Sequence, residues 1–319
     1  MEKVEIESQK LTNDVYKAGR QNIGIKKCFL CGKATSICNS HSIPRSILKN
    51  IAVEGMLLSG LYIDDHYGYK SKSGILNTWT FQIICRECDS KYFRHYEREK
   101  ALLLSPTEPI LSEIALKNGL FMLHKRLCDN SVQKILLSNH IDNSYDISPL
   151  FDKDDFSYVT RRARRYCDQQ LTEKHQVVFY DVLSWKAPIA VQSAITIHHN
   201  VYDGIVNDTF EYSTLVRMQP IHLCVFPYAT RTAILMFYDR WDSKNVAFEK
   251  QFLSLSHAKQ IEWINYIIFK SIEHFAISPL VKECLDNEYL KRLFLERASD
   301  KDKDCVRPNQ IPNFLLMKI

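Results

Sequence analysis

Hydrophobic residues recur at helical spacing through the second quarter of the chain. The segment "PILSEIALKNGLFMLHKRLCDN" carries them at Ile110, Ile114, Leu120, Leu123 and Leu127. The runs "CRECDSKYFRHYEREKALLL" before it and "DFSYVTRRARRYCDQQL" after it have a similar texture. A period near 3.6 residues is typical of helices with one buried face. The pattern therefore predicts helices up to about residue 172, with a boundary where Pro106 and Pro109 punctuate the chain.

The pattern of hydrophobic residues changes at residue 175. The runs that follow are rich in β-branched and aromatic residues and are bounded by turn residues: "QVVFYDVLSW", "PIAVQSAITIHHN", "QPIHLCVFPYAT" and "RTAILMFYDRW". The helical period returns after residue 245 in "SHAKQIEWINYIIFKSIEHF", where Ser256 is a candidate N-cap and "ISP" ends the run. Residues 175 to about 240 are therefore predicted to be mainly β, with helices on either side.

These textures predict an α+β fold with four parts. Residues 1–25 are a polar lead-in, and residues 26–105 form an N-terminal module that holds two cysteine pairs. Residues 106–172 are a helical connector. Residues 173–319 are predicted to form an antiparallel β unit closed by C-terminal helices, with a role in partner or substrate recognition that no motif assigns.

The composition and the apolar segments of the chain indicate a cellular compartment more clearly than they indicate a function. The chain is 45% hydrophobic with only 9 Gly and 10 Pro, which is typical of a globular protein. Lys and Arg exceed Asp and Glu by 42 to 37, a mild excess that is compatible with a nucleic-acid partner without requiring one. The N-terminus has no apolar signal-like segment, and no stretch of about 18 uncharged apolar residues occurs. We therefore predict a cytoplasmic protein with no membrane partner.

Four of the ten cysteines form two close pairs. Cys28 and Cys31 form one C-x-x-C, and Cys85 and Cys88 form the second. A single C-x-x-C also occurs in thioredoxin-like redox sites, but two pairs in a reducing compartment favour a four-thiolate zinc site over disulfides. The alternative is that one pair is incidental, which the Gly at the tip of "CFLCG" disfavours because Gly tolerates a knuckle turn. The sequence therefore predicts one structural Zn²⁺.

The order of the motifs resembles a known nuclease family. A knuckle with C-x-x-C is followed by "SHSIP" and then by "WTFQII", a predicted strand that leads into the second C-x-x-C at a helix start. This order is similar to the zinc-containing treble-clef branch of the HNH, or ββα-metal, nucleases, over about residues 26–100. Proteins of this kind often occur in bacterial defence loci. The resemblance implies a zinc-stapled treble-clef or ββα module and metal-dependent cleavage of nucleic acid.

The resemblance also implies roles for single residues. His41, followed by Ile43 and Pro44, matches the family's general base, and Asp89 falls where the family often has its helix histidine. Ser40 stands where the family has a metal-binding aspartate, and Thr80 takes the approximate place of its asparagine. A catalytic Mg²⁺ or Mn²⁺ is then expected on Asp89, with Glu97 or His95 as further ligands.

The spacing of these acids is compatible with one helical site. Asp89, Phe93 and Glu97 follow one another at four-residue steps, so one helix would place both carboxylates on neighbouring parts of a face. The alternative is that His41 is a structural hydrogen-bonded residue and that the acids form a solvated helix face. The alternative function is a catalytically inactive zinc-finger module that binds nucleic acid or protein.

Basic residues cluster near the proposed site and on one later helix. The predicted phosphate-binding residues are Arg45, Lys49, Arg86, Lys91, Arg94, Arg161, Arg162, Arg164 and Arg165. Their local concentration favours a polyanionic partner more than the net charge of +5 does. We therefore predict a nucleic-acid partner, DNA rather than RNA. A homo-oligomer or a co-encoded sensor or ATPase is the expected protein partner.

Overall fold

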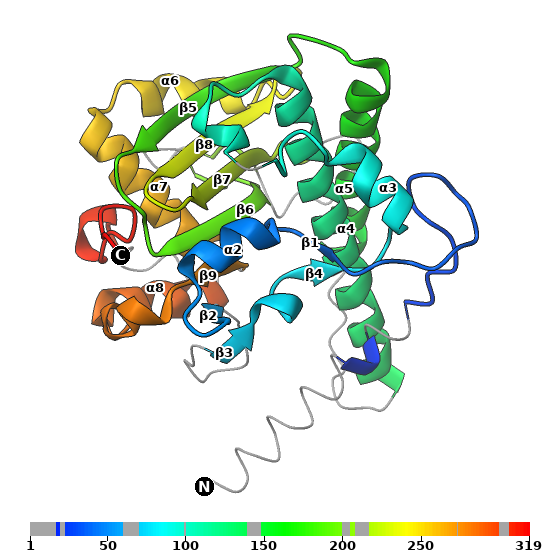
Figure 1. The fold of residues 1–319 in the computed structure, drawn as a ribbon, viewed down its shortest axis with the longest axis horizontal. Coiled ribbons are helices and arrows are strands. Elements are labelled where there is room, and N and C mark those ends of the chain that lie inside the picture. The colour runs from blue at the N-terminus through cyan, green and yellow to red at the C-terminus, as the bar shows by residue number, and fades with distance from the viewer. Residues whose placement is uncertain are drawn as a thin grey trace, which may run out of the picture.

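The computed structural model confirms an α+β fold built on antiparallel sheets, with a cysteine cluster near the N-terminus (Figure 1). The structure describes residues 17–19, 23–59, 70–98, 100–138, 148–199, 205–207, 217–272, 274–299 and 306–319. The predicted lead-in, residues 1–25, therefore lies mostly outside the described residues.

The elements of the first half include two long helices, α4 and α5. They are β1 (Ser40–His41), α2 (Arg45–Ile51), β2 (Met56–Ser59), β3 (Lys70–Gly74), η1 (Ile75–Asn77), β4 (Thr80–Phe81), α3 (Arg86–Tyr92), η2 (Ala101–Leu103), α4 (Glu108–Ser138) and α5 (Ser148–Gln169). The elements of the second half are β5 (His175–Leu183), β6 (Ile189–Ile195), β7 (Ile221–Pro227), β8 (Thr232–Asp239), α6 (Asn245–Leu253), α7 (His257–Ser271), β9 (Phe275–Ile277), η3 (Pro279–Leu285), α8 (Glu288–Ser299) and η4 (Pro308–Gln310).

The larger sheet has the strand order β3-β2-β9-β6-β7-β8-β5 within the described residues, and every neighbouring pair is antiparallel. The four strands predicted between residues 175 and 240 are present as β5 to β8. The sheet also contains β2 and β3, which come from the first quarter of the chain. The predicted domain ranges stay a prediction, but strands of the ranges 26–105 and 173–319 share this one sheet.

The central strands are buried on both faces, which explains their continuous apolar sequences. Every residue of β6, β7 and β8 is buried. On one face Ala190, Cys224 and Leu235 belong to the same core as buried residues of the cysteine module and of α4. On the other face Val191 and Met236 belong to a second core, which includes side chains of α6, α7 and α8. The sheet is therefore the middle layer of the protein.

Helix α4 lies between the cysteine module and the sheet, and α5 runs beside it (Figure 1). From Ile110 to Leu123 every residue of α4 is buried, so burial goes all the way round the helix there and includes the charged Glu113 and Lys117. A helix enclosed on all sides is buried by several neighbours at once. In the described part of the chain, no helix combines the length and the apolar character needed to cross a bilayer.

The strand, strand and helix order expected for the N-terminal module is present. β1 pairs with β4 in antiparallel register, Ser40 opposite Phe81 and His41 opposite Thr80. The helix α3 begins directly after Cys85. The chain between β1 and β4 passes through β2, which pairs with β9 of the larger sheet. The small β1–β4 ribbon is therefore tied to the sheet by its own connecting segment.

The helix after the second cysteine pair is shorter than the sequence pattern predicts. α3 ends at Tyr92, and Lys100 has a left-handed backbone with φ of 65°. The carboxylate of Glu113 accepts hydrogen bonds from the backbone N–H groups of His95 (2.9 Å) and Tyr96 (3.0 Å). These bonds satisfy donors that a continuing helix would have directed to its own carbonyls. A contact with α4 thus replaces the predicted helix by a turn.

The predicted helix over "SHAKQIEWINYIIFKSIEHF" is also shorter than expected. α7 begins after Ser256, as predicted, but it ends at Ser271. Phe275–Ile277 then forms β9, which pairs with both β2 and β6. Pairing on two sides gives this short segment a strand conformation that its sequence alone does not reveal.

Gly119 sets how closely α4 and α5 approach. A Cβ atom at this position would lie 2.6 Å from Thr160 Oγ1 and 3.2 Å from Thr160 Cα. Alanine favours a helix over glycine by about 1 kcal/mol, whereas overpacking a core costs about 1–3 kcal/mol. We expect Gly119→Ala to lower the free energy of unfolding by about 1 kcal/mol, measured by thermal and denaturant unfolding. In a double-mutant cycle, Thr160→Ala should reduce the loss of stability caused by Gly119→Ala. Strictly additive changes in the free energy of unfolding would contradict the close approach.

Candidate metal centre and the histidine beside it

The four paired cysteines meet at one point, as the sequence predicts. Their sulfur atoms all lie within 4.8 Å of one another, although the two pairs are separated by more than fifty residues. Cys28 and Cys31 lie on the knuckle, whose N–H of Gly32 bonds to the carbonyl of Cys28 at 2.8 Å. Cys85 is the N-cap of α3, and Cys88 lies in its first turn. Knuckle and helix start therefore supply two sulfurs each.

The donor set fits a structural zinc ion. Zn–S bonds of about 2.3 Å at tetrahedral angles place neighbouring sulfurs about 3.8 Å apart, and Cys31 Sγ lies 3.9 Å from Cys85 Sγ. Burial acts to raise the pKa of Cys28, but backbone N–H donors, including that of Cys85, lower it to about 7. A partly ionised thiol at neutral pH is ready to bind a cation as thiolate. When bound, the ion would staple the knuckle to α3, and four thiolates would leave no open coordination position for catalysis.

His41 is held in one tautomer at the end of β1. Its Nε2 lies 3.0 Å from the carbonyl oxygen of Ile75. A carbonyl only accepts hydrogen bonds, so Nε2 carries the proton and Nδ1 has the free lone pair. Burial lowers the pKa of His41, and the positive charges of Arg45 and Lys117 lower it further against the opposing effect of the Ile75 bond. The imidazole is therefore neutral near pH 7, with a basic nitrogen available.

The acids predicted as metal ligands do not share a helix face, but they do come together. Asp89 lies on α3, and Glu97 lies in the turn beyond its end. Both bind Lys117 of α4: its Nζ is 3.1 Å from Asp89 Oδ1 and 2.7 Å from Glu97 Oε1. Ser40 donates a further hydrogen bond of 2.6 Å to Asp89 Oδ1. A lysine that the sequence patterns did not single out thus joins the two carboxylates.

His95, the other predicted metal ligand, bonds to a residue of α4 and not to the group formed by Asp89, Glu97 and Lys117. Its Nδ1 forms a hydrogen bond with the carboxylate of Glu113 on α4. The same carboxylate holds the backbone of the turn, so the His95 ring is fixed against α4. His95 is therefore part of the turn that replaces the predicted helix.

These residues do not fit the predicted catalytic Mg²⁺ or Mn²⁺. Such ions need several hard oxygen ligands in near-octahedral geometry. Asp89 Oδ1 already accepts two hydrogen bonds, and Glu97 Oε1 is paired with the same ammonium group. Among the described residues, only the four cysteines bring three or more Cys, His, Asp or Glu ligand atoms within 4.8 Å of one another. Asp89, Glu97 and His95 are therefore held by Lys117 and Glu113 and not arranged around a divalent cation.

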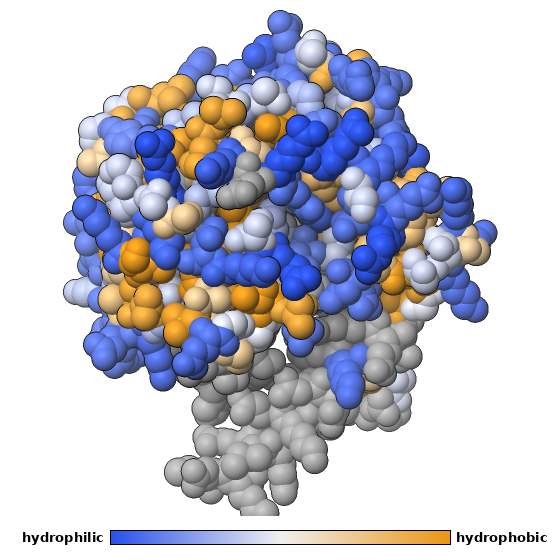
Figure 2. Space-filling model, viewed as in Figure 1, coloured by the Kyte–Doolittle hydropathy of each residue, from blue (hydrophilic) through white to orange (hydrophobic). Residues whose placement is uncertain are grey.

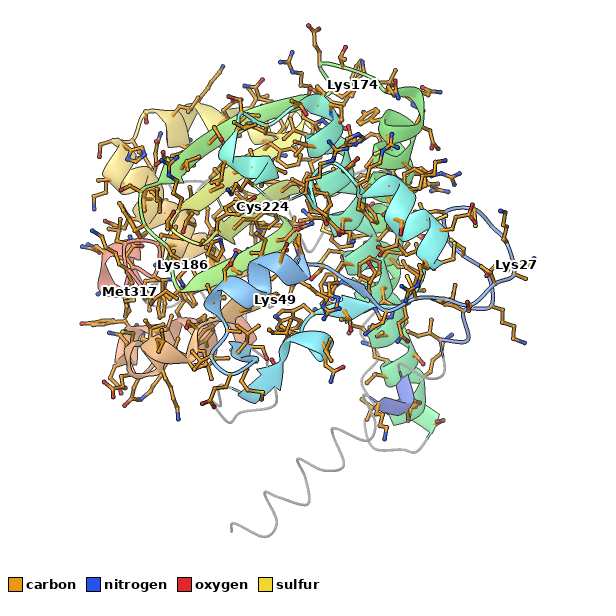
Figure 3. All side chains as sticks on the ribbon, viewed as in Figure 1. Lys27, Lys49, Lys174, Lys186, Cys224 and Met317 are labelled. Atoms are coloured by element: carbon orange, nitrogen blue, oxygen red, sulfur yellow. The ribbon has the colours of Figure 1, made fainter. Side chains whose placement is uncertain are left out.

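The basic residues of the module are exposed. Those predicted to bind phosphate are Arg45, Lys49, Arg86, Lys91 and Arg94, and all have exposed side chains. Lys27 stands at the outer edge of the knuckle, whereas Lys49 lies on α2, nearer the sheet (Figure 3). The face in view is mainly hydrophilic, with hydrophobic residues in separate patches (Figure 2). These cations are thus free to meet a polyanion approaching the module.

The four arginines of α5 separate into different environments. Arg161 and Arg165 are exposed. Arg162 is largely buried and forms ion pairs of 2.8 Å with Asp239 and with Asp242. Arg164 pairs with Asp168, four residues further along the helix, at 3.2 Å. Arg162 is thus engaged inside the protein, whereas Arg164 is paired at the surface. Arg161 and Arg165, which are exposed, remain the candidate phosphate contacts of α5.

Sequence reasoning missed the two α4 residues that organise the site, Glu113 and Lys117. Both are nearly fully buried. Their signal was visible as two charges at i and i+4 inside an otherwise apolar helical segment. Buried charges are rare unless they are paired, so such residues point to a specific partner elsewhere in the fold.

Comparison of the chain with protein-family models, with curated proteins and with solved structures found no match. The fold and the site define the class of protein by themselves: an α+β protein with a four-cysteine cluster that fits zinc, and with His41 under the influence of the charges of Asp89 and Lys117.

Proposed function

We propose that the protein is an HNH-like endonuclease that hydrolyses phosphodiester bonds of nucleic acid, DNA in preference to RNA, with His41 as the general base. The observation that carries the proposal is the bond between His41 Nε2 and the Ile75 carbonyl. It leaves Nδ1 as the proton acceptor in a ring whose pKa is lowered by burial. A neutral imidazole with one nitrogen fixed is suited to take a proton from an attacking water.

The reaction balances with the residues of this chain and water. His41 Nδ1 takes a proton from water as the water oxygen forms a bond to phosphorus. The bond from phosphorus to the leaving oxygen breaks, and its electron pair stays on that oxygen. The leaving oxygen is then protonated, directly or through solvent, by the proton that His41 releases. The products are an alcohol and a phosphate monoester.

The resemblance to HNH proteins of bacterial defence loci supports a role for this cleavage reaction in bacterial defence. In that setting the protein acts in the cytoplasm as the effector of an anti-phage system. It does so as a homo-oligomer or with a co-encoded sensor or ATPase. An effector of this kind can require activation, so its assay includes any protein encoded beside it.

A zinc-finger module that binds nucleic acid or protein without catalysis is the second candidate. One observation favours it: the carboxylates expected to bind a catalytic cation are paired with Lys117 instead. Binding without cleavage under every metal condition would support this candidate.

The deciding experiment incubates the purified protein with plasmid DNA and with RNA of matched length, and it measures binding in the same samples. We expect cleavage by the wild type and cleavage at least about 10²-fold slower by His41→Ala, while both proteins bind DNA equally. Equal, negligible cleavage by the two proteins, with binding retained, would overturn the nuclease proposal.

Arg45 and Arg86 are exposed basic residues whose charges act on groups in and beside the proposed site. The charge of Arg45 contributes to lowering the pKa of His41, and that of Arg86 acts on the neighbouring Cys38. Each phosphate contact contributes about 0.9 to the slope of log affinity against log salt. We expect Arg45→Ala/Arg86→Ala to reduce this slope by about 2, measured by fluorescence anisotropy over a salt series.

Lys174, at the upper edge of the view in Figure 3, supplies the control. Lys174→Ala should leave the slope unchanged. An unchanged slope in the double variant would remove the module surface from the proposed interface. The pair Arg161→Ala/Arg165→Ala then tests the exposed side of α5 by the same measurement.

A further inference from the structure

Lys117 is a buried cation at the centre of the proposed site. Its side chain is only 1% exposed, and its Nζ lies between Asp89 Oδ1 at 3.1 Å and Glu97 Oε1 at 2.7 Å. The ring of Phe93 lies beneath the ammonium group, with its centroid 4.0 Å away. Burying an unpaired charge is costly, so a lysine is retained in such a place only with compensating partners. Here two carboxylates and an aromatic face provide them.

The charges of this group leave little for a second cation to bind. Two carboxylates and one ammonium sum to −1, and Ser40 adds no charge because it is a neutral donor to Asp89. A divalent ion that bridged both carboxylates would share them with Lys117, whose ammonium group already binds one oxygen of each. It would also lie within a few ångströms of the positive charge of Lys117, which repels it.

We infer that Lys117 is the resident cation of this site, so that Asp89 and Glu97 do not bind Mg²⁺ or Mn²⁺ and the reaction proceeds without them. Its consequence for catalysis rests on the proposed nuclease function. The occupation of the two carboxylates by Lys117 does not depend on that function, and it is measured separately.

In the reaction Lys117 is a positioning residue, because its buried ammonium group is not exposed to touch substrate. It fixes Asp89 and Glu97, and it offsets one of their two negative charges. A phosphodiester carries a negative charge and is repelled by uncompensated carboxylates. With Lys117 in place, the exposed Arg45 near His41 can hold the phosphate without a bridging metal.

The direct test measures binding of Mn²⁺ by electron paramagnetic resonance to zinc-loaded protein. We expect no bound ion in the wild type at about 1 mM Mn²⁺, the range of weak protein sites. Lys117→Gln should gain one site, because it leaves two carboxylates without their cation. Those carboxylates are 27% and 37% exposed, so an ion can reach them. Asp89→Asn added to Lys117→Gln should abolish the new site.

The cleavage assay gives a second, independent readout. We expect the wild type to cut equally in buffer freed of divalent cations and in buffer with added Mg²⁺, at unchanged zinc content. Lys117→Gln should depend on added Mg²⁺ or Mn²⁺, an effect that a merely structural role of the lysine does not produce. Lys117→Met serves as the second variant if the glutamine variant does not fold, and it is judged by the same two measurements.

The outcomes separate this inference from the nuclease proposal. Stoichiometric binding of Mn²⁺ by the wild type that is lost in Asp89→Asn would overturn the inference, whether or not the protein cuts nucleic acid. Cleavage by the wild type that requires Mg²⁺ would also overturn it. Absence of both Mn²⁺ binding and cleavage would support the assignment of Lys117 as the resident cation and refute the nuclease.

Discussion

Replacing Cys88 by serine is expected to remove zinc from the protein and to unfold the N-terminal module. Cys88 lies in the first turn of α3, and its sulfur is one of the four that converge. Binding of structural zinc contributes about 10–16 kcal/mol in small zinc domains. In most cases this binding free energy exceeds the free energy of unfolding of a typical domain, which is about 5–15 kcal/mol. Loss of one thiolate should therefore release α3 from the knuckle, and Asp89 and the turn beyond it should lose their positions.

Elemental analysis and thermal unfolding check this result. The wild type should hold one zinc per chain, and Cys88→Ser should hold little and lose its cooperative transition. Cys38→Ser is the matched control, because Cys38 lies in the same module and outside the four-sulfur group. Zinc-free wild-type protein prepared without chelator, or native stability in Cys88→Ser, would contradict the zinc centre.

Replacing His41 by alanine is expected to lower the rate of cleavage by about 10²–10⁴-fold, the usual contribution of a general base. Substrate affinity should change little, because the proton is transferred in the transition state and not in the bound ground state. His41→Gln distinguishes chemistry from structure. Its amide can still donate to the Ile75 carbonyl, yet it has no basic nitrogen, so it should be as inactive as alanine while remaining fully folded.

The pH dependence of the wild type provides an independent check. A base must be deprotonated, so activity should fall as pH falls through the pKa of His41. Burial lowers that pKa from its usual value near 6.5, so the acidic limb should lie below pH 6.5 and activity should be level near neutrality. His257→Ala is the control, because His257 is exposed and pairs with Asp181 on β5. A midpoint above pH 7, or equal losses in both histidine variants, would exclude His41 as the base.

The zinc centre and the β-rich segment could be predicted because their signals are local. A C-x-x-C pair carries its own ligand geometry, so Cys28 and Cys31 identify a knuckle wherever it folds. The strand β8 could be recognised as well, since "AILMFYD" is a short apolar run bounded by turn residues. These features depend on residues that lie close together in the sequence, and the structure confirms the four-cysteine cluster and the strand.

The sequence by itself determined the α+β class and the four-cysteine cluster. Only the tertiary structure decided where α3 ends and what the acids beyond it bind. Glu113 and Lys117 lie on a helix about twenty to thirty residues further along the chain, and no local pattern connects them to His95, Asp89 or Glu97. A buried charge must be satisfied by whatever group the fold brings within reach. The sequence of α4 shows that Glu113 and Lys117 need partners, but the packing of the fold determines which residues those partners are.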